Sequence, residues 1–217
     1  NNLVATKNLI DFAIDCKDLK LFVNISTSSI YGIRATLTEE EAPEPASFYG
    51  VTKLAAEQLV LSKTRENKLN TCSLRLFSVY GPRERPEKLY SKLIGCGFFH
   101  QEFPLYTGSG EHVRSFTYVE DIIDGVVSVI GKEEEVRGEV FNLGTEHEHT
   151  TAEGIDIVED ILNTKIIKKD TPRRQGEQLL TKANIAKARR VLGYDPKTTL
   201  KEGLQKQIDW YRKEFVE

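Results

Sequence analysis

Short apolar runs alternate along the chain with longer amphipathic stretches. The apolar runs are rich in β-branched and aromatic residues, have the length of strands and span residues 20–27, 71–79, 113–119 and 138–144. The amphipathic stretches repeat apolar positions at helical spacing and span residues 3–16, 49–65, 119–130, 152–162, 182–192 and 200–215. Strands that alternate with helices pair in parallel through right-handed crossovers, so the pattern predicts an α/β layered fold.

Local signals refine several of these elements. The spacing of Thr150 and Glu153 is that of a capping box, which predicts the start of the helix over 152–162. The pair Gly81-Pro82 predicts a sharp turn after the second strand. The acidic run at 39–41 is typical of a solvated turn.

The predicted sheet is short of strands for its class. A dinucleotide-binding sheet opens with a strand, a glycine-rich turn and a helix, yet the sequence contains no Gly-x-Gly-x-x-Gly motif. It also contains no methionine. We therefore expect the chain to be a processed or excised fragment, with the first half of such a sheet preceding Asn1.

Composition narrows the class of protein. The 217 residues carry 30 basic and 33 acidic side chains, a net charge of −3, which excludes a generally basic nucleic-acid binder. No apolar run is long enough to span a bilayer, so no membrane partner is expected. The three cysteines, Cys16, Cys72 and Cys96, are widely spaced and form no zinc-binding pattern, which indicates reduced thiols, a cytoplasmic location and no metal site.

The first candidate for chemistry is the pair Tyr49 and Lys53. Four residues apart on a helix, the two side chains share a face, where an ammonium stabilises a phenolate and lowers the pKa of the phenol. Chance produces this spacing often, and the alternative is an amphipathic helix with a surface lysine. The context of the pair decides between them.

Hydroxyl groups follow the first predicted strand, which runs into Ser26, Thr27, Ser28 and Ser29. Parallel sheets bind ligands at the carboxyl ends of their strands, and four consecutive hydroxyls are a poor choice for a core. The second strand likewise stops at Ser78 before its turn. An edge strand running into a turn is the structural alternative.

At this point the chain resembles the extended short-chain dehydrogenase/reductases that act as nucleotide-sugar epimerases and dehydratases. The segments that carry the resemblance keep the order of that family: NNLVATKNLI, STSSIYG, PASFYGVTKLAAEQL, LRLFSVYGPRERPE, GSGEHVRSFTYVEDIIDGV, VFNLG and PRRQGEQ followed by KARRVLGYDP. The resemblance implies a partial Rossmann-type parallel sheet in residues 1–81 and 119–144. It implies a smaller nucleotide-sugar-binding domain in residues 82–118 and 145–217.

The resemblance also implies roles for these residues. Tyr49 would be the general base and acid on a sugar hydroxyl, Lys53 would bind the nicotinamide ribose of NAD, and Thr27 would orient the hydroxyl. The cofactor-binding residues would be Asn1, Ser26, Tyr49, Lys53, Phe77, Ser78 and Val79. The substrate-binding residues would be Thr27, Ser28, Ser78, Leu105, Tyr106, Arg114 and Arg174, with Arg173 an alternative to Arg174. Ser115 replaces the aspartate usual after the arginine at 114.

The sequence lacks the two carboxylates that a dehydratase of this family would need, which limits the reactions that the chain could catalyse. The 4,6-dehydratases of the family carry Asp-Glu after the catalytic threonine, and this chain has Ser28 and Ser29 there, which cannot supply the acid and base of a dehydration. The turn GPRERPE and Ser78 are more similar to UDP-glucuronate 4-epimerases and their relatives than to the galactose enzymes, which usually have Asn in place of Ser78. We therefore expect an NAD-dependent epimerase that inverts C4 of a UDP-sugar through a keto intermediate.

Two further expectations concern the state of the protein. Helices 3–16 and 49–65 resemble the pair with which the family forms a homodimer. The alternative is that the chain is a catalytically silent or truncated family member, which acts as a nucleotide-sugar-binding protein or as a regulatory protein. Because the glycine motif lies outside the chain, we expect the 217 residues alone to be inactive.

Overall fold

A three-stranded parallel sheet forms the centre of the computed structural model, which describes residues 2–173 and 178–217. Its strands are β1 (Phe22–Thr27), β3 (Thr71–Leu76) and β8 (Val140–Leu143), in the order β1-β3-β8. Phe22 pairs with Thr71 and Ser73 with Val140, both in parallel register. The predicted α/β class with parallel pairing is confirmed, and the carboxyl ends of the three strands meet at one edge.

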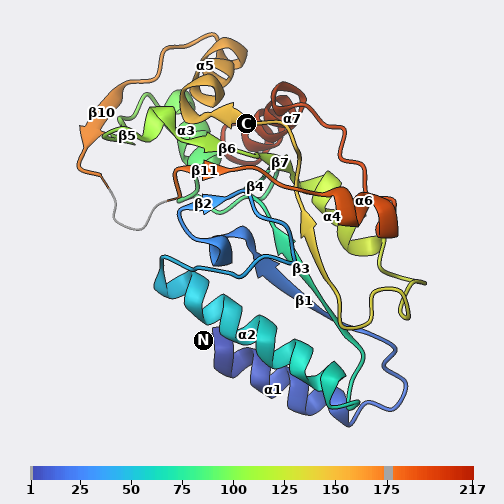
Figure 1. Cartoon of the computed structure of the whole chain (residues 1–217). Coiled ribbons are helices and arrows are strands. Elements are labelled where there is room, and N and C mark those ends of the chain that lie inside the picture. The colour runs from blue at the N-terminus through green and yellow to red at the C-terminus, as the bar shows by residue number, and fades with distance from the viewer. Residues whose placement is uncertain (1, 174–177) are drawn as a thin grey trace.

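Helices cover both faces of this sheet (Figure 1). On one face α1 (Asn2–Ile14) packs against α2 (Phe48–Arg65), which contacts β1 and β3. On the other lie α4 (Val119–Val127) and α6 (Ala186–Leu192). The first hydrophobic core forms here, around the fully buried Leu74, Phe77 and Phe141.

A second core lies beyond the carboxyl ends of the strands. It is built by α3 (Leu89–Phe98), α5 (Thr151–Leu162) and α7 (Leu200–Phe215), beside the parallel pair β5 (Phe103–Tyr106) and β10 (Lys168–Thr171). The predicted capping box is confirmed, because Thr150 accepts from the Glu153 amide and Glu153 accepts from the Thr150 amide. Thr199 and Glu202 form another capping box at the start of α7.

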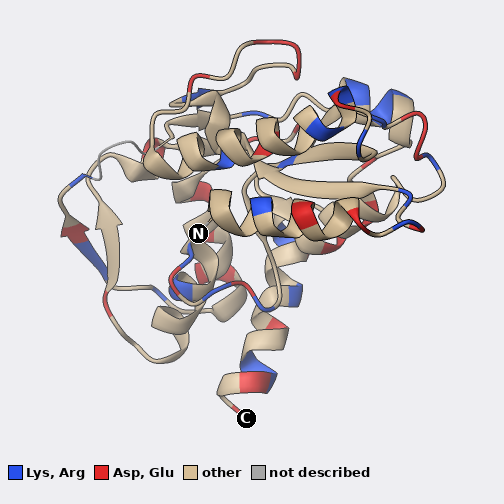
Figure 2. Ribbon diagram, turned by 90° about the horizontal axis from the view of Figure 1, so that it is seen from below, with Lys and Arg blue, Asp and Glu red and all other residues tan. Residues whose placement is uncertain are grey.

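Short strands and 3₁₀ turns connect the two cores. One small sheet has the order β2 (Arg34–Ala35), β11 (Leu180–Thr181), β6 (Val113–Arg114), β9 (His149–Thr150). Another pairs β4 (Val79–Tyr80) with β7 (Thr117–Tyr118). The 3₁₀ turns are η1 (Ser28–Tyr31) and η2 (Ser109–Glu111). Lys and Arg positions are interspersed with Asp and Glu positions along the ribbon (Figure 2), as the near-balanced charge leads one to expect.

The structure departs from the predicted elements in several places. The runs 71–79 and 113–119 each divide into two strands, and the helix predicted over 182–192 begins only at Ala186. Residues 183–194 were predicted to belong with the second domain, but they contribute to the first core because α6 contacts β8. Helix α3 was not predicted, since Gly95 and Gly97 obscure its pattern.

Side chains form hydrogen bonds with backbone groups at both edges of the main sheet. The amide of Asn142, on the outer edge of β8, donates to Glu39 Oε1 at 2.8 Å. Glu39 is therefore half-buried rather than the freely solvated turn residue predicted for the run 39–41. At the opposite edge, the Lys53 amine donates to the Ile25 carbonyl of β1. No strand in residues 2–173 or 178–217 pairs with the outer edge of β1.

A helix that crosses a bilayer needs about 20 consecutive, mostly apolar residues. Throughout the part of the chain that the structure describes, every helix is too short or too polar to cross a bilayer.

Candidate active site

The carboxyl ends of β1 and β3 open into a cavity of about 840 Å³. Its walls come from the end of β1, the first turns of α2, the turn after β4 and the side chains of Arg114 and Gln178. Thr27, Tyr49 and Lys53 all line it. The structure thus brings together the three residues that the sequence analysis singled out as catalytic.

The hydroxyl run after β1 is buried, yet it faces this cavity. Ser26, Thr27 and Ser28 are each exposed by less than a tenth, but with Ser29 they line the cavity and do not belong to either core, as the position at a strand end predicts. Thr27 caps η1 by accepting a hydrogen bond from the Ser29 amide at 3.2 Å. Ser26 Oγ finds no hydrogen-bond partner among the described residues, and a buried hydroxyl without a partner is costly.

The first turn of α2 positions Tyr49 and Lys53 against that strand end. Ser47 caps the helix by accepting from the Gly50 amide at 3.1 Å. Gly50 has no side chain to keep the helix away from η1, since a Cβ there would lie 2.7 Å from the Ser29 carbonyl oxygen. Tyr49 remains half exposed at the mouth of the cavity.

The amine of Lys53 lies farther in. It donates a hydrogen bond to the carbonyl of Ile25. Burial lowers the pKa of this amine, and the negative charge of Glu57, one turn along α2, opposes the shift. An ammonium at this position stabilises a negative charge that develops on a neighbouring oxygen.

After the end of β3, only some of the predicted cofactor-binding residues line the cavity. Ser78 and Val79 line the cavity, as expected of cofactor-binding residues. Phe77 does not, because its side chain is fully buried in the first core, with its ring 6.3 Å from that of Tyr31. The turn at Gly81-Pro82 is present, and Gly81 takes a φ of 137° there, beside Val119.

Positive charge surrounds the outer part of the cavity. Arg83, Arg85, Lys88 and Arg114 all line it. The acidic residue among them, Glu84, is turned inward, where it accepts from Gln207 Nε2 at 3.0 Å, and burial raises the pKa of its carboxyl. This concentration of cations favours an anionic ligand.

Arg114 and Gln178 connect β6 to the η1 turn at the cavity. Arg114 donates to the backbone carbonyls of Val113 and Gln178. The Gln178 side chain donates to the carbonyls of Ser28, at 3.3 Å, and Gly32, at 2.9 Å. The sequence analysis missed Gln178, whose role depends on a contact across about 150 residues.

A smaller cavity of about 290 Å³ adjoins the first and shares Ser78, Lys88 and Arg114 with it. Leu105 and Tyr106, the predicted base-contacting residues, line it. The predicted site residues Asn1 and Arg174 lie outside the described part of the chain, and Arg173 is exposed.

Comparisons with known proteins agree with this geometry. Residues 1–144 match the profile of the NAD dependent epimerase/dehydratase family. The chain is 34% identical over 211 residues to a protein of Bacillus subtilis named as an uncharacterized UDP-glucose epimerase, covering 96% of this chain and 65% of that protein. It is 29% identical over 229 residues to UDP-glucuronate 4-epimerase 2 of Arabidopsis thaliana, covering 97% and 52%.

The fold is also similar to that of solved structures. The UDP-glucuronic acid 4-epimerase of Bacillus cereus, solved with UDP-glucuronic acid and NAD, superposes with a TM-score of 0.94 at 32% identity, covering 99% of this chain and 68% of that one. The chain spans between about half and two thirds of the length of the curated relatives named above. The match over residues 1–144, more than half of the chain, establishes that it belongs to the NAD dependent epimerase/dehydratase family, a family of enzymes.

Proposed function

We propose that this protein is part of an NAD-dependent epimerase that inverts C4 of a UDP-sugar. The observation that carries the proposal is the convergence of Thr27, Tyr49 and Lys53 on one cavity at a strand end, beside a wall of cations. A catalytically silent relative would have no need to keep these three side chains together. The relatives and solved structures named above support the same reaction class.

The residues of the cavity fit the nicotinamide half of NAD. The unpartnered hydroxyl of Ser26 and the amine of Lys53 offer hydrogen-bonding groups at its inner end. Ser78 and Val79 supply a second wall, and Lys53 would hold the ribose. When bound, NAD supplies the acceptor for a hydride from C4 and later its donor.

The protein's own groups then handle the proton. Thr27 orients the sugar hydroxyl at C4 towards the phenol oxygen of Tyr49. Tyr49 acts as the base, removing the proton from that hydroxyl as the keto sugar forms, and as the acid that returns it. The Lys53 ammonium stabilises the phenolate during this exchange. Inversion requires the keto sugar to turn over between the two proton transfers.

The cationic wall supports an anionic sugar nucleotide as substrate. Arg114, between the two cavities, is suited to the diphosphate, because a guanidinium matches phosphate oxygens in geometry and charge. Leu105 and Tyr106 offer an apolar surface to the uracil base. Arg83 and Arg85 favour a sugar that carries a carboxylate, and we therefore propose UDP-glucuronate ahead of UDP-glucose.

The experiment is an activity assay on the protein with NAD bound. UDP-glucuronate and UDP-glucose are incubated with it separately, and the product is identified by proton NMR from the coupling constants at C4. We expect the galacto-configured product from UDP-glucuronate at the higher kcat/KM. Loss of water from C6 of UDP-glucose instead of inversion, or no conversion of either sugar, would refute the proposal.

A further inference from the structure

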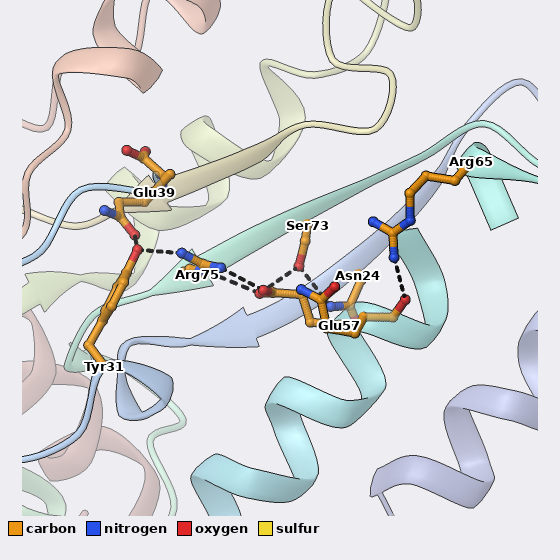
Figure 3. Close-up of polar contacts among 9 residues, drawn as sticks. Asn24, Tyr31, Glu39, Glu57, Arg65, Ser73 and Arg75 are labelled. Carbon is orange, nitrogen blue, oxygen red and sulfur yellow. Dashed lines mark hydrogen bonds and ion pairs between the residues drawn. The ribbon is translucent and has the colours of Figure 1, made fainter. Parts of the chain in front are cut away.

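A buried ion pair joins the middle of α2 to the central strand (Figure 3). Arg75 Nη2 lies 2.7 Å from Glu57 Oε1 and Arg75 Nε lies 3.1 Å from Glu57 Oε2, so the pair is bidentate. The Glu57 side chain is fully buried and the Arg75 side chain is 3% exposed. Such a pair tolerates little displacement, because moving either partner leaves an uncompensated charge in the interior.

Neutral groups complete the shell of the carboxylate. Ser73 Oγ donates to Glu57 Oε2 at 3.2 Å, and Asn24 Nδ2 donates to Ser73 Oγ at 2.8 Å (Figure 3). Asn24 belongs to β1 and Ser73 to β3. The carboxylate of one α2 residue is therefore tied to both strands that end at the cavity.

The guanidinium extends the network in the other direction. Arg75 Nη1 donates to the Tyr31 hydroxyl at 2.6 Å (Figure 3). That hydroxyl donates to Asn142 Oδ1 at 2.9 Å. Tyr31 ends η1, the turn that carries the hydroxyls of the site, and Asn142 lies on β8. The network thus holds α2, η1 and all three strands of the main sheet in one arrangement.

Glu57 lies on the same helix face as the candidate catalytic groups. Tyr49, Lys53 and Glu57 follow one another at intervals of four residues, which on an α-helix places them in a row. The network therefore fixes the rotation of α2 from one end of this row. It also places a carboxylate one turn behind the ammonium.

We propose that Glu57 is a positioning residue for the candidate site: clamped by Arg75, it fixes the rotation of α2 and holds its carboxylate one turn from the Lys53 amine. The proposal rests on the proposed function for its catalytic meaning. Its structural and electrostatic content concerns the chain as it stands.

The charges around Lys53 support this assignment. Burial lowers the pKa of the Lys53 amine and Glu57 raises it. The strand against which the amine lies, β1, has no ionisable side chain in Phe22–Thr27. The other charged side chains that line the cavity are Arg83, Glu84, Arg85, Lys88 and Arg114. Four of these five are cations, which disfavour another ammonium. Glu57 raises the Lys53 pKa even though it is itself paired with Arg75 of β3.

The test measures the pKa of Lys53 directly. The protein is labelled with acetic anhydride over a range of pH, and the extent of acetylation of each lysine is read by peptide mass spectrometry. The variant Glu57→Gln keeps the shape of the side chain but removes its charge. Because it leaves Arg75 buried without a counter-charge, the double variant Glu57→Met/Arg75→Met is measured as well, since replacing both partners with apolar groups is often neutral for stability.

We expect the pKa of Lys53 to fall in Glu57→Gln, because the carboxylate that raises it is lost while the charge of Arg75 stays. The fall should be smaller in the double variant, which removes one charge of each sign. Glu66→Gln is the matched control, because Glu66 caps the far end of the same helix and pairs with Lys63 and Lys68. The Lys53 pKa should not move in that control. An unchanged Lys53 pKa in folded Glu57→Gln would overturn the proposal.

Activity adds a second readout in the NAD-binding form of the protein. We expect kcat to fall by on the order of tenfold or more in the double variant, with KM for the UDP-sugar changed by less than about threefold. Equal kcat would overturn the positioning role. If the unaltered protein has no epimerase activity, the proposed function fails, and the labelling experiment still decides the role of Glu57 towards Lys53.

Discussion

The hydroxyl of Tyr49 is the group on which the proposed reaction depends most. Lys53 and Thr27 line the same cavity as Tyr49. The sequence placed these three at one site through the family resemblance, because the Tyr49–Lys53 spacing alone arises often by chance. Gln178 and the Glu57–Arg75 pair could not be predicted, since their partners come from distant segments.

Replacing Tyr49 by phenylalanine removes the proton-transfer group and preserves the ring. In the NAD-binding form we expect kcat to fall by on the order of 10²–10⁴, with binding of the UDP-sugar nearly unchanged. Turnover is followed by NMR and binding by calorimetry. Tyr211→Phe, on α7 far along the chain, is the control and should keep full activity. Normal turnover in Tyr49→Phe would exclude the tyrosine as base.

Two helices, α5 and α3, show why only part of the fold could be predicted from the sequence. The capping box at Thr150 and Glu153 is a local signal and was predicted correctly. Helix α3 was missed because two glycines interrupt it, and tertiary packing explains both. A Cβ at Gly95 would lie 2.7 Å from the Tyr211 hydroxyl, and one at Gly97 would lie 2.5 Å from Leu162 Cδ1. Neither contact is visible in the local pattern.

The same packing predicts an unusual response to alanine in α7. Gly203→Ala improves helix propensity by about 1 kcal/mol, but the new methyl would lie 2.1 Å from the Tyr80 hydroxyl oxygen and 2.9 Å from Tyr118 Cδ2. Both rings are buried, so we expect a net loss of about 1–2 kcal/mol in the free energy of unfolding, measured in urea. Lys201→Ala, exposed in the same helix, should change little. A stabilised Gly203→Ala would contradict the packing.

An acidic residue on α5 predicts how stability depends on pH. Although burial alone raises the pKa of Glu159, hydrogen bonds from Lys165 and Lys168 lower it to about 2. Since the pKa is depressed in the folded state, the stabilisation is complete above about pH 4.5 and is lost as the pH falls towards 2.

The measurement compares wild type with Glu159→Gln by urea unfolding at pH 7, 5 and 3. We expect a loss of about 1–2 kcal/mol at pH 7, discounted because Lys165 is largely exposed, and a much smaller difference at pH 3. Glu102→Gln, which removes an exposed pair with Lys169, is the control and should show no such convergence. A difference independent of pH would contradict the assigned ion pairs.

At the scale of the whole molecule, α1 and α2 present an apolar surface to solvent. The side chains of Leu9, Phe12 and Phe48 are 59%, 73% and 94% exposed. We propose that this face forms a homodimer. Phe12→Glu should then convert a dimer to a monomer in light scattering, whereas Ile130→Glu, equally exposed beyond α4, should not. A monomeric wild type at micromolar concentration would refute the proposal.

The two sheet edges have unequal consequences for assembly. A carboxylate on the Asn142 amide leaves β8 unable to accept an incoming strand without expelling a charge, so growth of the sheet in that direction is blocked. At β1 the obstacle is the Lys53 amine on the Ile25 carbonyl, and an ammonium on a flexible stem is easily displaced. A strand that adds along β1 would take that carbonyl and release Lys53 towards the cavity. Pairing at this edge of β1 would therefore also change the position of the Lys53 amine at the cavity.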